Sequence, residues 1–276
     1  MASVALIIHA DDLGMARAIN RATLDALARG AVTSASAMVP CPHFAEVAGW
    51  AAAHPAADIG IHLTFTCDDW ARPGWGPLTL PELVPSLVSP AGVFWPDADT
   101  FRRNARPEDV EIEATAQVEA AMAAGLAPTH LDSHMFALAR SAELAAVLGR
   151  VSRRFALPCL DILRRPSAAP DPLRPTFAKV IVANISDADG PGIAPYLRLL
   201  DQCRPGLNEL IVHCGDDDDE MRGLMGGTRA FGAAARQGDT AALLDPAFTA
   251  AVAERRIDLI SWRDLAAGGK QPPSQA

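Results

Sequence analysis

The chain has 276 residues, 50% of them hydrophobic, and a formal net charge of −9 at pH 7. This composition excludes an intrinsically disordered chain, and the length suits one α/β barrel of roughly 250 residues. Because Lys and Arg form no cluster, the acidic balance argues against a nucleic-acid partner and favours a small-molecule substrate.

The cysteines and the N-terminal segment indicate the compartment. The five cysteines are odd in number and widely spaced, which favours reduced thiols in a cytoplasmic protein. The apolar start of the chain is too short for a signal peptide and lacks basic flanks. No uncharged run reaches the roughly 20 residues of a membrane-spanning helix, so we expect no membrane span.

The N-terminal part alternates strands and helices. Val4–Ile8 is a continuous apolar run, typical of a strand buried on both faces. In chain order it is followed by a predicted helix over 16–29, a strand over 34–39, a helix over 42–54 and a strand over 59–64. Residues 65–106 are rich in Pro, Gly and Trp, and this composition predicts a long loop or small insertion over the core.

The same alternation continues to the C-terminus. The elements predicted there are a helix over 108–124, a strand over 129–132, a helix over 141–155, a strand over 158–163, a helix over 193–203, a strand over 207–213, a helix over 246–255, a strand over 257–261 and a helical turn over 262–267. The irregular stretch 164–189 is compatible with one more strand at 179–183. The acidic run 216–220 is expected to be an exposed loop, and 268–276 a flexible tail. The alternation predicts a parallel sheet with crossover helices in a single domain over 1–267; the pattern alone leaves an open or a closed sheet undecided.

Polar residues cluster where the predicted strands end. The residues at or just after the carboxyl ends of strands are Asp11, Asp12, His62, His134 and His213. In a barrel these ends converge on one face, where the active site lies. Four separate features at one face indicate metal-assisted hydrolysis, because the chain carries no phosphate loop or dinucleotide fingerprint.

Each feature also has a plain structural interpretation. One of the adjacent acids Asp11 and Asp12 can bind a metal while the other acts on water, but either can simply cap the following helix. His62 lies among apolar residues and is compatible with a histidine satisfied within the core.

Two more segments carry paired polar groups. In an extended segment His130, Asp132 and His134 share one face, so they can supply a metal ligand with its supporting partners or form a buried hydrogen-bonded cluster. Glu209 and His213 share a face of the next polar strand, and this histidine can donate a proton to a leaving group or be structural.

Taken together, the segments resemble the YdjC-like carbohydrate deacetylases. The matching motifs are His9-Ala-Asp-Asp-Leu-Gly14, Gly30-Ala-Val-Thr-Ser34, Gly60-Ile-His-Leu-Thr64, Pro128-Thr-His-Leu-Asp-Ser-His134, Glu209-Leu-Ile-Val-His213, Leu243-Leu-Asp-Pro246 and Ile257-Asp-Leu-Ile-Ser-Trp-Arg-Asp-Leu265. The resemblance is colinear over nearly the whole chain. It implies an irregular (β/α) barrel of about seven parallel strands, similar to polysaccharide deacetylases, and removal of N-acetyl groups from amino sugars with a divalent metal.

The resemblance also implies roles for single residues. Asp12, His62 and His134 resemble the metal ligands, Asp11 the general base and His213 the general acid. His130, Asp132 and Glu209 are expected to be supporting or substrate-binding residues. The cofactor is one divalent ion, Mg or Zn, with Mn, Co or Ni also compatible with the mixed nitrogen and oxygen ligands.

The chain departs from the family at two places. Met135-Phe136-Ala137 replaces further histidines, which predicts a less polar rim, and His9 stands where the family commonly has Asn. The alternatives to an N-acetyl deacetylase are a hydrolase of a different amide or ester with the same metal centre, and a catalytically silent binding module. A small acetylated sugar is the expected partner, and a homodimer is compatible with the sequence.

Overall fold

A computed structural model describes residues 3–71, 74–165, 169–185, 189, 192–225 and 230–266. The predicted tail at 268–276 lies outside these residues. None of the helices described is long and apolar enough to cross a membrane.

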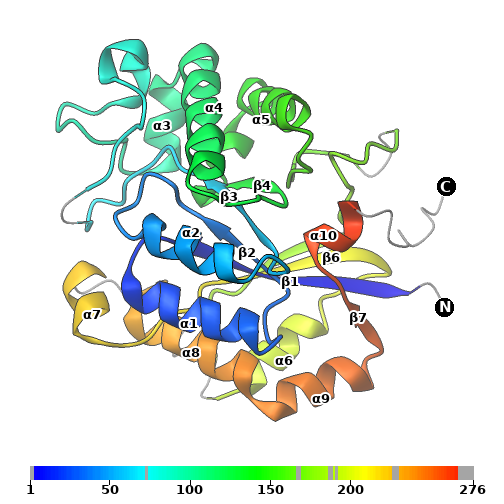
Figure 1. Cartoon of the computed structure of the whole chain (residues 1–276). Helices are drawn as coiled ribbons and strands as arrows, with labels where there is room; N and C mark the ends of the chain where they lie inside the picture. Colours follow the sequence, from blue (N-terminus) through cyan, green and yellow to red (C-terminus); the bar gives the residue numbers. More distant parts are fainter. Residues whose placement is uncertain are drawn as a thin grey trace.

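A seven-stranded sheet forms the centre of the described part of the chain, and all of its pairings are parallel (Figure 1). Its strands are β1 (Val4–Leu13), β2 (Ser34–Ala37), β3 (Ile59–Leu63), β4 (Leu131–Ser133), β5 (Lys179–Val182), β6 (Gly206–Val212) and β7 (Ile257–Leu259). They follow the order β4-β3-β2-β1-β6-β5, and β7 pairs with β1. Within the described residues no pairing joins β4 to β5, so the barrel is open there. The predicted irregular parallel barrel is confirmed.

Strand β1 lies at the middle of this sheet because its apolar run can be buried on both faces. One edge of β1 pairs with β6 from Val4 to Ala10. The other edge is shared: β7 pairs with the first three residues of β1, and β2 pairs with it from His9 onward. The ladder with β2 shifts register between Ala10 and Leu13. This irregularity falls at the two adjacent aspartates.

The helices cover the outside of the sheet. They are α1 (Arg17–Ala28), α2 (Phe44–Ala53), α3 (Ala98–Asn104), α4 (Pro107–Ala123), α5 (Ala142–Phe155), α6 (Ala194–Leu200), α7 (Asp219–Met225), α8 (Ala233–Leu244), α9 (Pro246–Glu254) and α10 (Trp262–Ala266), with 3-10 helices η1 (Pro81–Leu83), η2 (Pro85–Leu87) and η3 (His134–Arg140). In Figure 1, α4 and α5 lie on the side of β3 and β4, whereas α1, α8 and α9 lie on the opposite side. The main core fills the space between helices and sheet, and a smaller cluster around Ile7 and Trp262 fills the inside of the barrel.

The predicted strand at 158–163 is wrong. Only Cys159 bridges to β4, opposite Leu131. Pro158 has no backbone N–H to give to a ladder, and Asp161 turns the chain by accepting the backbone N–H of Leu163. The seventh strand is instead β5, at the position where the sequence was compatible with one.

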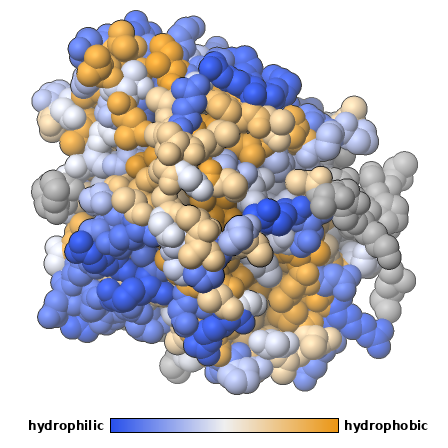
Figure 2. All heavy atoms as spheres, viewed as in Figure 1, coloured by the Kyte–Doolittle hydropathy of each residue, from blue (hydrophilic) through white to orange (hydrophobic). Residues whose placement is uncertain are grey.

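The predicted loop at 65–106 contains regular structure. Helix α3 lies near the C-terminal end of this segment. It begins at Ala98 because the Asp97 side chain accepts the N–H groups of Asp99 and Thr100. The same segment leaves Leu80 and Leu83 exposed. It lies at the upper left of Figure 1, and Figure 2 shows hydrophobic residues on the surface of that region. Helices α7 and α8 were not predicted, and α7 begins inside the acidic run at 216–220.

Candidate metal centre

The two adjacent aspartates lie at the irregular end of β1. Asp12 has a φ of 74°, in the left-handed region that side chains other than glycine rarely adopt. Gly14 follows with a φ of 94°, and a Cβ there would lie only 3.1 Å from the carbonyl oxygen of Met38. The tight turn therefore requires this glycine. Asp11 and Asp12, which precede it, both line the same cavity.

Three of the predicted ligands meet at this point. The Asp12 Oδ1 atom lies 3.2 Å from His134 Nδ1 and 3.5 Å from His62 Nε2. One ligand atom from each of Asp12, His62 and His134 lies within 4.8 Å of the others, and all three residues are buried. The structure thus brings together the end of β1, strand β3 and the start of η3, as the strand-end positions predict.

The donor atoms fit a divalent cation. Asp12 Oδ1 and His62 Nε2 are buried and have no hydrogen-bond partner. Buried polar atoms without partners are rare and usually indicate a missing ion or water. A set of two imidazoles and a carboxylate suits Zn, Mn, Co or Ni.

In both His62 and His134, the ring nitrogen that faces away from Asp12 contacts a carboxylate. His62 Nδ1 donates to Asp132 Oδ1 at 2.8 Å, which leaves Nε2 as the metal-facing nitrogen. His134 Nε2 lies 3.2 Å from Asp68 Oδ2, which leaves Nδ1 facing Asp12. Carboxylate partners of this kind fix the tautomer and orientation of metal-binding histidines.

The carboxylates in this group stabilise positive charge on their neighbours. Burial alone would lower the pKa of His134, but the nearby carboxylates of Asp12 and Asp68 outweigh it and raise the pKa to about 10. Burial also opposes ionisation of Asp12, yet the nearby Arg236 and His134 hold its pKa well below the usual range. A metal ion at Nδ1 of His134 therefore has to displace a proton.

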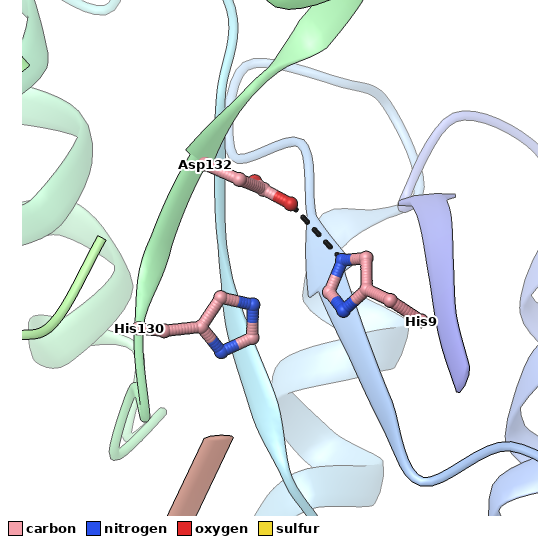
Figure 3. A group of neighbouring side chains, drawn as sticks. All are labelled: His9, His130 and Asp132. Carbon is pink, nitrogen blue, oxygen red and sulfur yellow. Dashed lines mark ion pairs between the residues drawn. The ribbon is translucent and has the colours of Figure 1, made fainter. Parts of the chain in front are cut away.

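Two other groups of side chains have similar spacing. They are Asp11 with His62 and Asp132, and His9 with His130 and Asp132. Figure 3 shows the second group, with His9 on β1, Asp132 on β4 and His130 directly before β4. In both groups Asp132 already accepts from His62 and from Ser36, so its oxygens are less available than those of the first set.

Asp11 and His213 lie together beside the proposed ligands. Asp11 Oδ2 is 3.7 Å from His62 Nε2 and 3.8 Å from His213 Nε2. The His213 ring packs edge-on against Phe231, at 4.6 Å between centroids, and burial lowers the pKa of this histidine to about 4. Its resting imidazole is therefore neutral near pH 7.

The residues predicted to support the site lie at different depths. Asp132 contacts His62 directly, whereas His130 and Glu209 contact Trp262. None of the three lines the cavity. His130 stacks on Trp262 at 4.8 Å, with 9° between the rings. Glu209 Oε1 accepts the indole N–H of Trp262 at 2.9 Å, and burial raises the pKa of this carboxyl to about 7. These two residues form a layer beneath the centre.

Three residues that contact the proposed site were not predicted from the sequence. Arg236 Nη2 lies 2.6 Å from Asp12 Oδ2, and both side chains are buried. Asp239, one turn further along α8, accepts the backbone N–H of His213 at 2.8 Å. Asp68 comes from the segment predicted as a loop. A strand-end search cannot find residues that reach the site from a helix or a loop.

A cavity of about 540 Å³ opens above the proposed ligands. Its lining combines the aspartates and His134 and His213 with apolar side chains; the apolar and aromatic lining residues are Met15, Trp70, Ala98, Met135, Phe136, Val182, Ile211, Met225, Ala230 and Phe231. Met135 and Phe136 reach it from a left-handed turn, with φ of 53° and 49°. The volume falls within the usual range for a small-molecule site.

Comparison with known proteins points to one family. The family model described as YdjC-like protein matches residues 5–254. A carbohydrate deacetylase of Geobacillus stearothermophilus is 31% identical over 265 residues, which cover 94% of this chain and 97% of that protein. A carbohydrate deacetylase of Thermus thermophilus is 34% identical over 79% of this chain and 80% of its own. A crystal structure from Enterococcus faecalis, described as a cellobiose-phosphate cleavage protein, superposes with a TM-score of 0.79 at 26% identity and covers 96% of this chain and 100% of that one.

Proposed function

We propose that this chain, which belongs to the YdjC-like protein family, is a metal-dependent hydrolase that removes an N-acetyl group from an acetylated amino sugar or a related small substrate. The observation that carries the proposal is the buried group of Asp12, His62 and His134, whose members Asp12 and His134 line a cavity together with Asp11. The name carbohydrate deacetylase, given to relatives that match most of this chain, supports the substrate class.

Asp12, His62 and His134 would hold one divalent ion. When bound, this ion would supply Lewis acidity to the acetyl carbonyl and to the attacking water. The ligand set favours Zn, Mn, Co or Ni, and Mg, which prefers oxygen ligands, is the weaker fit. Asp132 and Asp68 would hold the two histidines in the tautomers that binding requires.

Asp11 would act as the general base. Its Oδ2 atom faces His62 and His213 at 3.7 and 3.8 Å, and therefore lies next to the space where water and substrate meet. A general base has to reach the proton that it abstracts, directly or through one water. Asp11 lines the cavity and would meet this requirement, while Asp12 would hold the ion.

His213 would deliver the proton to the departing amine. Because burial lowers the pKa of His213 to about 4, its imidazole is neutral at rest, and the proton that it donates would be the one that Asp11 removes from water. The step balances: one O–H bond of water and the amide C–N bond break, a C–O and an N–H bond form, and the products are acetic acid and the amine, which become acetate and ammonium when the acid proton passes to the amine.

Acetate release from N-acetylated oligosaccharides tests this function. The purified protein is stripped with EDTA, reloaded with Zn, Mn, Co, Ni or Mg, and compared on N-acetylated sugars and on phosphate and acyl esters. We expect metal-dependent acetate release from the sugars. Turnover of esters alone would instead show a different hydrolase, and no turnover with any metal would indicate a binding module.

Single substitutions separate the roles of the residues. Asp11→Asn should abolish turnover and leave metal affinity unchanged, whereas His62→Ala should lose the metal. Asp25→Asn makes the same chemical change at an exposed residue of α1 and should alter neither. An Asp11→Asn protein with full activity would remove Asp11 as the base.

A further inference from the structure

His9 lies beneath the candidate centre and contacts two of its carboxylates. The ring is fully buried, and its Nε2 atom is 3.2 Å from Asp11 Oδ1 and 3.0 Å from Asp132 Oδ2. Figure 3 shows the pair with Asp132 as a dashed line. One ring nitrogen on β1 therefore meets a carboxylate of its own strand and one from β4.

Each of these carboxylates uses its second oxygen elsewhere. Asp11 turns Oδ2 toward His62 and His213. Asp132 turns Oδ1 to His62 Nδ1, at 2.8 Å. The oxygens that face His9 are thus the ones that the proposed reaction and the proposed metal ligand do not use.

The surroundings show why a cation fits here. The titratable groups that face His9 are Asp11, Asp132, Glu209 and His130, and its other polar contacts are the hydroxyls of Ser34 and Ser36. Two buried carboxylates this close to one another need a positive partner, because unpaired buried charges are costly. Burial opposes protonation of His9, but the pairs with Asp11 and Asp132 outweigh it and raise the pKa well above its usual value.

We propose that His9 is a positioning residue, which holds Asp11 for proton abstraction and Asp132 for orienting His62. Its role rests on the proposed function only through Asp11. The other contact of His9, with Asp132 and through it with His62, predicts an effect on metal affinity that can be measured without turnover. His9 is neither a cavity-lining residue nor one of the three proposed ligands, so it acts through its two partners, Asp11 and Asp132.

Substitutions at position 9 can keep or remove the important contact. His9→Leu has a similar size and removes both nitrogens. His9→Gln places an amide N–H close to the position of Nε2, so it can still donate to the two carboxylates. His9→Asn places its amide near Nδ1, on the side of Ser34. His54→Gln, at an exposed histidine stacked on Trp50, is the matched control.

The measurements are kcat, KM and calorimetric Zn affinity. For His9→Leu we expect kcat and Zn affinity each to fall roughly 10- to 100-fold, the usual effect of removing such a partner, with KM little changed. His9→Gln should recover most of both losses, and His54→Gln should match the wild type. If the Leu protein does not fold, His9→Gln should still exceed His9→Asn in both readouts.

Several outcomes would overturn the proposal. They are a folded Leu protein with wild-type kcat and Zn affinity, a Gln protein no better than the Leu protein, or a Gln protein no better than the Asn protein. Failure of the proposed function looks different. If the wild type releases no acetate, the Zn affinities of the same variants still decide whether His9 supports His62.

Discussion

Glu209→Gln is expected to stabilise the protein at pH 8 and to have little effect near pH 5. The Glu209 side chain is buried beside Trp262. Its Oε1 atom accepts the indole N–H of Trp262, and its Oε2 atom has no hydrogen-bond partner. Burial raises the pKa of this carboxyl from 4.5 to about 7. The folded protein therefore has to carry a buried charge at alkaline pH, and glutamine removes that charge while keeping the acceptor for Trp262.

The sign and size follow from proton binding. Between pH 4.5 and about 7 the folded state holds a proton on Glu209 that the unfolded state releases. Stability from this group is thus fully present below pH 4.5 and is lost as the pH rises through about 7. The difference between the two pKa values corresponds to roughly 3 kcal/mol, which is the expected gain of the Gln protein at pH 8.

Urea unfolding followed by circular dichroism measures this gain. Both proteins are unfolded at pH 5, 6, 7 and 8 with EDTA present, so that metal binding does not contribute. Glu254→Gln, at an exposed end of α9, is the control and should show no comparable pH dependence. The reasoning would be refuted if the free energies of unfolding of Glu209→Gln and wild type differed by the same amount at every pH, or if Glu209→Gln were less stable than wild type at pH 8. A loss at pH 8 would show that His9 stabilises an ionised Glu209.

Three further predictions concern stability. Arg236→Met should lower the free energy of unfolding of the metal-free protein by roughly 3–5 kcal/mol, because it removes the cation paired with Oδ2 of the buried Asp12 carboxylate; urea titration measures this. Gly60→Ala places a Cβ 2.4 Å from the His130 ring and should cost about 1–3 kcal/mol, whereas Gly223→Ala meets open space and should cost little in the same assay. Zn at 100 times its Kd should add about 2.7 kcal/mol to the wild type and nothing to His62→Ala, as thermal unfolding would show.

The strands were predictable because they are buried on both faces. Val4–Ile8 is a continuous apolar segment, and Leu210–Val212 is a shorter one directly before His213; such segments are typical of parallel sheets. The same rule failed at 158–163, where an apolar stretch begins with a proline and turns at Asp161. Local pattern does not reveal whether a short apolar run finds a ladder partner.

The site was predictable only where it is built from strand ends. Asp12, His62 and His134 were expected together, and their ligand atoms lie within 4.8 Å of one another. Arg236 and Asp68 come from α8 and from the 65–106 segment, and nothing in their local sequence marks them as partners of the site. Their positions depend on tertiary packing, which periodicity does not encode.

The irregular end of β1 explains how two adjacent aspartates can take different roles at one site. In a regular strand successive side chains point to opposite faces, so one of Asp11 and Asp12 would leave the cavity. The register shift and the left-handed φ of Asp12 bring both side chains to it. Each then meets its own cation, because Arg236 pairs with Asp12 and His9 pairs with Asp11. Two neighbouring carboxylates therefore reach one buried site with separate partners, Asp12 facing His62 and His134 and Asp11 facing His62 and His213.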